Sequence, residues 1–209
     1  MNPIDASVSR AFNQAYYDSH VWAETKWLGV QVLKSPTDLW SYQEILAEIQ
    51  PDIIIETGTH AGGSALFLAS VCDLLGCGRI ISIDIIPRTD LPAHERITYL
   101  VGSSTDPALV ETVTSLSTDQ KCLVILDSDH SQGHVACEMD TYAPLVSIGS
   151  YLIVEDTNIN GHPVLDGYGP GPMEAVEDFL RGRSDFAPDE CRERFALTFN
   201  PKGYLRRHR

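Results

Sequence analysis

The stretch Pro51-Asp-Ile-Ile-Ile-Glu-Thr-Gly-Thr-His-Ala-Gly-Gly-Ser-Ala65 decides the fold that this sequence predicts. Its three consecutive isoleucines, Ile53 to Ile55, are typical of a β-strand buried on both faces. Gly58, Gly62 and Gly63 then allow a sharp turn, and Ser64 begins an apolar helical stretch. A strand, a glycine-rich turn and a helix N-terminus together indicate a ligand site at the carboxyl end of a strand in an open α/β sheet. A tight turn with a purely structural role is the alternative interpretation.

A second strand ends in an acid, which narrows the choice of ligand. Residues Arg79-Ile-Ile-Ser-Ile-Asp84 form another buried strand pattern, and a carboxylate at its end can accept hydrogen bonds from both hydroxyls of a ribose. That spacing suits both NAD and S-adenosylmethionine. A G-x-G-x-x-G turn cradles a pyrophosphate, but here the order is Glu56-x-Gly58-x-x-x-Gly62. A carboxylate before the turn repels a pyrophosphate and attracts the ammonium and sulfonium of S-adenosylmethionine, so the residues favour the methyl donor.

Length and composition are those of an ordinary globular chain. The 209 residues, 43% of them hydrophobic, predict one domain, 1–209, in which an N-terminal helical segment, 1–50, covers the site of an α/β core, 51–209. No apolar run reaches the roughly 20 residues that cross a bilayer, and the first residues are too polar for a signal peptide. We therefore expect a soluble, cytoplasmic protein.

The charge and the cysteines give two further predictions. A net charge of −14 excludes a nucleic-acid partner, and five cysteines without a C-x-x-C pair predict reduced thiols.

The order of the patterns predicts a doubly wound α/β fold. Short strand patterns alternate with helical ones, which is typical of a mostly parallel sheet, and we expect seven strands with an antiparallel C-terminal hairpin. A helix at 4–17 precedes the core and could close over the site or pack on a partner subunit. The segment 22–33 predicts an ordered loop, and Asp38 predicts an N-cap for a helix at 39–49. The expected strands are 53–56, 79–84, 97–101, 122–127 and 151–156, with a hairpin of 195–200 and 204–206.

Polar residues follow the third strand pattern. Ser103, Ser104 and Asp106 lie at its carboxyl end, beside the first turn of a doubly wound sheet, where they could meet an adenine edge. An N-cap for the helix that begins at Pro107 is an equally good interpretation.

Acids also end the fourth and fifth strand patterns. Asp127, Glu155 and Asp156 would repel one another unless a cation lay among them, and an all-oxygen set suits Mg²⁺ or Mn²⁺ better than Zn²⁺. Helix caps and turn residues are the alternative. A Gly- and Pro-rich loop, 157–172, leaves directly from the acidic strand end and is a candidate lid over an acceptor substrate.

Several short motifs together resemble the cephalosporin hydroxylase family. They are Lys34-Ser-Pro-Thr-Asp-Leu-Trp-Ser-Tyr-Gln-Glu44, Glu56-Thr-Gly-Thr with Gly62-Gly-Ser64, Leu126-Asp-Ser-Asp-His130, and Val154-Glu-Asp-Thr157 with Asn160-Gly161. The resemblance covers about 27–205 and implies a class I (Rossmann-like) methyltransferase that depends on S-adenosylmethionine and a divalent metal. Such enzymes are related to catechol and macrolide-sugar O-methyltransferases. By this resemblance Glu56, Gly58 and Ser64 hold the amino-acid part of the donor, Asp84 holds its ribose, and Asp127, Glu155 and Asp156 hold the metal, with Asp129 as an alternative to Asp127.

The expected reaction is methyl transfer to a hydroxyl of a small molecule, such as a sugar or another secondary metabolite. A bound metal would lower the pKa of the acceptor hydroxyl and orient it. His130 is the first candidate for the general base and Asp129 the second, although His130 could instead cap a helix. The full set expected around the donor is Glu56, Gly58, Thr59, Gly62, Ser64, Asp84, Ser103, Ser104 and Asp127.

Two other functions compete with this one. Asp127, His130 and His134 could form a two-His-one-carboxylate site for non-haem iron, which would make the chain an oxygenase. That interpretation leaves the glycine turn, Asp84 and the Glu155-Asp156 pair without a role. A donor-binding protein without turnover is the third possibility. The resemblance also implies a homo-oligomer.

Overall fold

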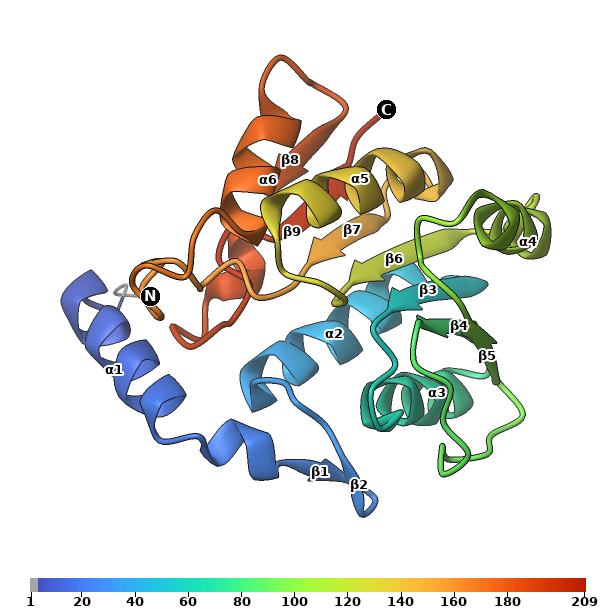
Figure 1. Cartoon of the computed structure of the whole chain (residues 1–209), viewed down its shortest axis with the longest axis horizontal. Coiled ribbons are helices and arrows are strands. Elements are labelled where there is room, and N and C mark those ends of the chain that lie inside the picture. Colours follow the sequence, from blue (N-terminus) through green and yellow to red (C-terminus); the bar gives the residue numbers. More distant parts are fainter. Residues whose placement is uncertain (1–3) are drawn as a thin grey trace.

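A seven-stranded sheet forms the centre of the molecule (Figure 1), in a computed structural model that describes residues 4–209. Residues 1–3 of the predicted N-terminal segment lie outside the described residues. Neighbouring strands follow the order β5-β4-β3-β6-β7-β9-β8, and the first five are parallel, whereas β9 is antiparallel to both of its neighbours. The strands are β3 (Ile53–Thr57), β4 (Arg79–Asp84), β5 (Ile97–Val101), β6 (Cys122–Leu126), β7 (Tyr151–Val154), β8 (Phe186–Pro188) and β9 (Tyr204–Arg207).

Helices cover both faces of this sheet, which confirms the doubly wound fold. The long parallel strands are apolar on both faces, as β3 shows, where Ile53 to Ile55 are at most 3% exposed. One face packs on α2 and α3, and the other on α4, α5 and α6, as Figure 1 shows on the two sides of the strands. The helices are α1 (Ala6–Asp18), α2 (Pro36–Ile49), α3 (Gly63–Leu75), α4 (Pro107–Ser117), α5 (Gln132–Tyr142) and α6 (Pro172–Leu180).

The C-terminal strands and the early loop differ from the prediction. β9 pairs with β8, at Phe186–Pro188, and not with 195–200, which forms no strand. The antiparallel edge was therefore predicted correctly, but its partner was wrong. The predicted loop at 22–33 contains a short 3₁₀ helix, Val21–Glu24, and a two-stranded hairpin of β1 (Lys26–Trp27) and β2 (Val30–Gln31). Strands of two residues are too short to leave a period in the sequence.

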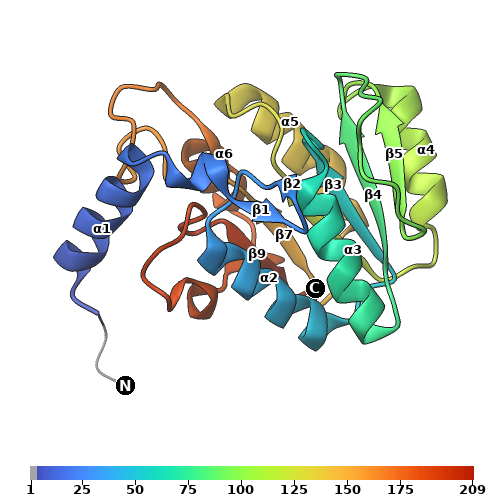
Figure 2. The same ribbon diagram turned by 90° about the horizontal axis from the view of Figure 1, so that it is seen from below.

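The segment 195–200 instead joins the N-terminal helix to the core. In α1, the side chains of Ser9 and Asn13 donate hydrogen bonds to the carbonyl of Ala196, at 2.6 and 2.7 Å. The rings of Tyr17 and Phe199 pack edge to face with centroids 5.6 Å apart. Both views place α1 at the end of the molecule opposite α4 and β5 (Figures 1 and 2).

Asp38 is not the N-cap of α2. The helix begins two residues earlier, at Pro36, so Asp38 lies in its first turn and is buried. Its carboxylate accepts hydrogen bonds from Thr198 Oγ1 at 2.6 Å, the Phe199 amide at 2.8 Å and Tyr204 Oη at 2.8 Å. Burial raises the pKa of Asp38 to about 6, so the group is ionised above that pH. The prediction that Asp38 caps this helix was wrong. Proline is favoured at the first position of a helix, so α2 begins at Pro36 and not after Asp38.

Replacing Asp38 with Asn is expected to destabilise the protein by about 1–3 kcal/mol, because one buried donor would lose its acceptor. The amide NH₂ would face either the Phe199 amide, which cannot accept from it, or the two hydroxyls, which could accept only by turning their own protons away from residue 38. Urea denaturation at pH 8 measures the effect. The exposed Asp90→Asn is the control, and equal stability of the two variants would show that the contacts of Asp38 contribute nothing net.

Candidate functional site

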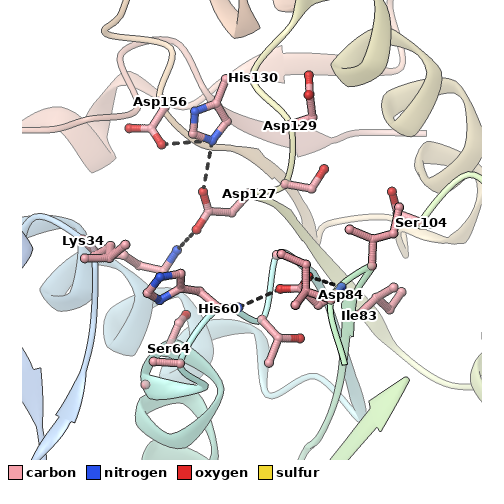
Figure 3. A pocket seen from close by; sticks show the side chains of 18 of the residues that line it. Lys34, His60, Ser64, Ile83, Asp84, Ser104, Asp127, Asp129, His130 and Asp156 are labelled. Carbon is pink, nitrogen blue, oxygen red and sulfur yellow. Dashed lines mark hydrogen bonds and ion pairs between the residues drawn. The ribbon is translucent and has the colours of Figure 1, made fainter. Parts of the chain in front are cut away.

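One pocket of about 790 Å³ runs along the carboxyl ends of the parallel strands. This volume is within the range of pockets that bind small molecules and cofactors. Figure 3 shows side chains from several strand ends turned into it. Because the strands follow the order β5-β4-β3-β6-β7, the pocket meets Ser103, Asp84, Gly58, Asp127 and Asp156 in that sequence.

The glycine turn after β3 is held by a very close backbone contact. Gly58 has φ of +87°, and a Cβ at this position would lie 1.7 Å from the carbonyl oxygen of Asp127. Only glycine allows the two strand ends to approach in this way. Gly62 ends the turn in the left-handed conformation and precedes α3. The amide of His60 donates to Asp84 Oδ2 at 2.9 Å, which ties the turn to the end of β4 (Figure 3).

Most residues expected around the donor line this pocket. Glu56 and Gly62 are the exceptions, because neither reaches the pocket surface among the described residues. Glu56 is completely buried and accepts a hydrogen bond from Ser82 Oγ at 2.7 Å. Ile85 and Ile86, which the sequence analysis missed, are exposed pocket residues beside Asp84 and offer an apolar surface. The expected donor residues that line the pocket are Gly58, Thr59, Ser64, Asp84, Ser103, Ser104 and Asp127.

The polar residues after β5 have divided roles. Asp106 is the N-cap of α4, since its Oδ1 accepts from the amides of Ala108 and Leu109, both at 3.1 Å. Ser103 and Ser104 line the pocket, so they remain available to a ligand. The N-cap interpretation is therefore confirmed for Asp106, while the contact of Ser103 and Ser104 with an adenine edge stays a prediction.

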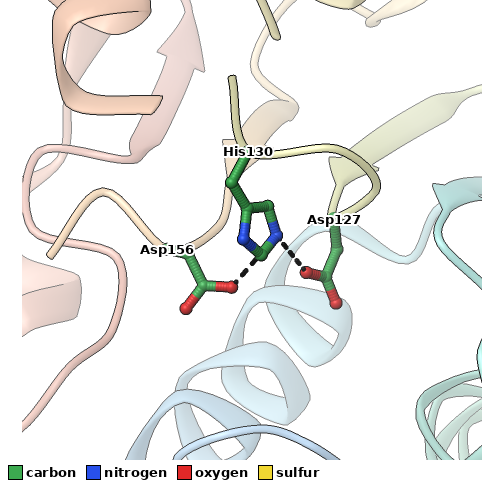
Figure 4. Close-up of side chains that lie close together, drawn as sticks. All are labelled: Asp127, His130 and Asp156. Atoms are coloured by element: carbon green, nitrogen blue, oxygen red, sulfur yellow. Dashed lines mark ion pairs between the residues drawn. The ribbon is translucent and has the colours of Figure 1, made fainter. Parts of the chain in front are cut away.

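Two carboxylates and an imidazole converge at the ends of β6 and β7 (Figure 4). His130 Nε2 lies 3.5 Å from Asp127 Oδ1 and 3.3 Å from Asp156 Oδ2. At these distances the contacts are ion pairs, and the buried Nε2 atom has no hydrogen-bond partner among residues 4–209. Burial lowers the pKa of His130, but the carboxylates of Asp127 and Asp156 outweigh it and raise the pKa to about 9. The imidazole is consequently a cation at neutral pH.

Lys34, which the sequence analysis used only as part of a motif, enters the same cluster. Its Nζ donates to Asp127 Oδ2 at 2.6 Å and to Glu155 Oε1. The pKa of Lys34 is lowered by burial but raised more strongly by Asp127, Glu155 and Glu56, so the amine stays protonated. Glu155 thus faces Lys34, while Asp156 faces His130. The predicted metal set of Asp127, Glu155 and Asp156 converges only in part: Asp127 and Asp156 are together, and Glu155 is on the far side of Lys34.

The cluster fits a divalent cation. One atom each from Asp127, His130 and Asp156 lies within 4.8 Å of the others, and the two carboxylates already share one positive charge, that of the imidazolium between them. Carboxylate oxygens suit Mg²⁺ or Mn²⁺. Burial raises the pKa of Asp156 to about 6, which a nearby cation would reverse.

Asp129 and His134 lie apart from this cluster. Asp129 Oδ1 accepts from the Ser131 amide at 2.8 Å, and the side chain and the amide of Ser131 together lower the pKa of Asp129. His134 Nε2 is 3.1 Å from Ser128 Oγ and 3.4 Å from Glu138 Oε1. The iron site postulated from Asp127, His130 and His134 is therefore not assembled.

Aromatic side chains line the pocket beyond Asp156. Tyr17 and Trp22 stack with centroids 5.4 Å apart, and Trp22 meets Phe199 edge to face at 5.9 Å. They come from the N-terminal segment and from the loop before β9, which local sequence patterns cannot bring together. The loop 157–172, expected to be a lid, contributes no residue to the pocket lining within the described chain. The loop is instead bonded to helix α6, because the side chain of Asn160 donates to Glu174 Oε1 of that helix at 2.9 Å.

Comparisons with known proteins agree on one family. Residues 19–208 match the family described as rhamnosyl O-methyltransferase/CmcI. The chain is 42% identical over 214 residues to a rhamnosyl O-methyltransferase of Mycobacterium tuberculosis (strain H37Rv), covering 99% of this chain and 87% of that protein. It is also 42% identical over 210 residues to a rhamnosyl O-methyltransferase of Mycobacterium leprae, covering 97% and 91%.

Solved structures share the fold. An apo structure of CmcI superposes with a TM-score of 0.69 at 24% identity, covering 90% of this chain and 77% of that one. A CmcI structure with Mg and SAM also gives 0.69, at 22% identity and with 90% and 78% covered. The methyltransferase MycE from mycinamycin biosynthesis, in complex with Mg and SAH, gives 0.51 at 18% identity, covering 66% and 38%. No helix within 4–209 is long and apolar enough to span a membrane.

Proposed function

This chain belongs to the rhamnosyl O-methyltransferase/CmcI family, and we propose that it transfers a methyl group from S-adenosylmethionine to a ring hydroxyl of a sugar with the help of a divalent cation. The observation that carries the proposal is the continuity of one pocket from the glycine turn of β3 to the cluster of Asp127, His130 and Asp156. A donor at the turn and an acceptor at the cluster would be neighbours there. In-line transfer requires this arrangement.

In the proposed reaction the two carboxylates of the cluster and its imidazole have different roles. A cation held by Asp127 and Asp156 would act as a Lewis acid and lower the pKa of the acceptor hydroxyl. We assign the general base to His130, which would receive the proton at Nε2. A nitrogen that binds a cation cannot accept a proton, so this role places His130 beside the cation and not on it. The acceptor oxygen forms a bond to the methyl carbon as the carbon–sulfur bond breaks, and the sulfonium becomes a neutral thioether.

The aromatic end of the pocket suits a sugar ring. Tyr17, Trp22 and Phe199 present flat apolar surfaces beside Asp156, and the C–H face of a deoxysugar such as a rhamnosyl residue packs well on such rings. Its hydroxyls would then point to the polar cluster. The homo-oligomer and the cytoplasmic location expected from the sequence stay predictions.

Binding and turnover measurements test the proposal. Calorimetry is expected to show binding of S-adenosylmethionine and none of NAD, because the turn Gly58-x-x-x-Gly62 lacks the G-x-G-x-x-G pattern that cradles a pyrophosphate. Mg²⁺ is expected to raise the melting temperature, because it would relieve the repulsion between Asp127 and Asp156. Methylation of a rhamnoside should require Mg²⁺ or Mn²⁺ and stop with a chelator. Binding of NAD alone, or full turnover in a chelator, would refute the proposal.

A tryptophan variant tests the acceptor end in the same assay. Trp22→Ala is expected to raise the KM for the rhamnoside by about tenfold, since a buried aromatic contact is worth roughly 1.4 kcal/mol or more. The Kd for S-adenosylmethionine should not change. Trp40→Ala is the matched control, because Trp40 is exposed on α2 outside the pocket. Equal KM values for the two variants would place the acceptor elsewhere.

A further inference from the structure

We propose that Lys34 is an internal cation that occupies the space between Asp127 and Glu155 in the metal-free enzyme and must release Glu155 when a divalent metal binds. Lys34 would then set the metal affinity of the site. This inference rests on the proposed function, because it assumes that the site takes a divalent cation. It gives a role to the ion pair of Lys34 with Glu155, which is buried apart from Asp156.

The contacts of Lys34 are those of a resident ion. Its side chain is 2% exposed and lies between Glu155, which is 5% exposed, and Asp127. It donates to one oxygen of each carboxylate. Lys34 lines the pocket and Glu155 does not, so the ammonium group separates Glu155 from the space where a metal would enter.

The backbone after β7 divides the two adjacent acids. Asp156 has φ of +54°, a left-handed conformation that non-glycine residues seldom adopt, and its amide donates to Asn200 Oδ1 at 3.1 Å. This turn directs Asp156 toward His130 and leaves Glu155 facing Lys34. Glu155 can therefore exchange one cation for another without a change in Asp156.

The charges make the two cations competitors. The ammonium group bridges the carboxylates of Asp127 and Glu155, which would repel each other in its absence. A metal bound by Asp127 and Asp156 competes with Lys34 for Asp127, and it can add Glu155 as a third carboxylate only when Lys34 releases that residue. Each cation weakens the attraction that the other feels, so removal of one should strengthen the binding of the other.

Replacing Lys34 with Met tests this competition, because methionine keeps the length of the side chain and removes the charge. Without metal, Lys34→Met is expected to melt about 10 °C below the wild type, since it leaves two buried carboxylates without their partner. Its Kd for Mg²⁺, measured by calorimetry, is expected to be about tenfold smaller than that of the wild type. Saturating Mg²⁺ should therefore raise its melting temperature more than it raises that of the wild type.

The control variant is Lys121→Met, which removes the same charge from an exposed position at the opposite end of β6. Its Kd for Mg²⁺ should equal that of the wild type. If Lys34→Met binds Mg²⁺ no more tightly than Lys121→Met, the proposal is wrong, and weaker binding would mean that Lys34 instead orients the two carboxylates. If the wild type binds no Mg²⁺, the proposed function fails first.

A measurement on the wild type covers the case in which Lys34→Met does not fold. The buried ammonium group of Lys34 should give a ¹⁵N resonance that Lys34→Arg removes and thereby assigns. Saturation with Mg²⁺ is expected to shift that resonance as the group leaves Glu155. An unchanged resonance in protein that has bound Mg²⁺ would overturn the proposal.

Discussion

Replacing His130 with Gln is expected to slow methyl transfer by about 10²–10⁴-fold, the usual contribution of a general base. Glutamine keeps a polar group near Asp127 and Asp156 but cannot take a proton at neutral pH. The Kd for S-adenosylmethionine should change little, because the donor turn lies on β3 and β4. Rates at saturating donor and acceptor measure the loss.

Asp129→Asn is the matched control, because Asp129 was the other candidate for the base. Its carboxylate accepts from the Ser131 amide, and its pKa is lowered, so Asp129 is a weak base although it lines the pocket. Its rate should stay within about threefold of the wild type, because the change removes neither the base nor a carboxylate of the cluster. A large loss in Asp129→Asn with a small one in His130→Gln would exchange the two roles.

The pH dependence gives an independent test of His130. Its pKa of about 9 means that the metal-free protein holds the imidazole as a cation at neutral pH, and only the neutral form can accept a proton. A divalent cation near Asp127 and Asp156 repels the imidazolium and lowers that pKa. The rate should therefore rise with pH, with an inflection below 9, and His130→Gln should remove the inflection.

Replacing Gly58 with Ala is expected to weaken the binding of S-adenosylmethionine by more than about a hundredfold and to destabilise the fold by several kcal/mol. The new methyl group would lie 1.7 Å from the carbonyl oxygen of Asp127, so either the glycine turn or the end of β6 would have to move. Both border the pocket. Calorimetry with the donor and urea denaturation measure the two effects.

Gly29→Ala separates the steric clash from backbone strain. Gly29 has the same φ of +87°, but a Cβ there would meet nothing within 4 Å. The free energy of unfolding of this variant should fall by only about 1 kcal/mol, the cost of an alanine in the left-handed conformation, and the variant should bind the donor normally. If the two variants were equally impaired, the close approach of Gly58 and Asp127 would have no importance.

The sequence by itself predicted the parallel strands of the sheet and the edge of the sheet at which a pocket forms. The runs Ile53 to Ile55 and Cys122 to Leu126 are apolar because both faces of a parallel strand are covered, and this composition can be recognised without coordinates. The acids Asp84, Asp127 and Asp156 follow such runs directly. Since the carboxyl ends of parallel strands meet at one edge, local patterns were sufficient to place these acids in a common pocket.

Only the tertiary structure decided which partners those acids have. Lys34 contacts Asp127 across 93 positions and Glu155 across 121, and Asp38 reaches Thr198 across 160. The aromatic wall of Tyr17, Trp22 and Phe199 likewise joins the two ends of the chain. Residues so far apart leave no period or spacing in the sequence, because their contact depends on how helices and loops pack on the sheet. The same packing turns Glu155 toward Lys34 and Asp156 toward His130, although both acids end the same strand.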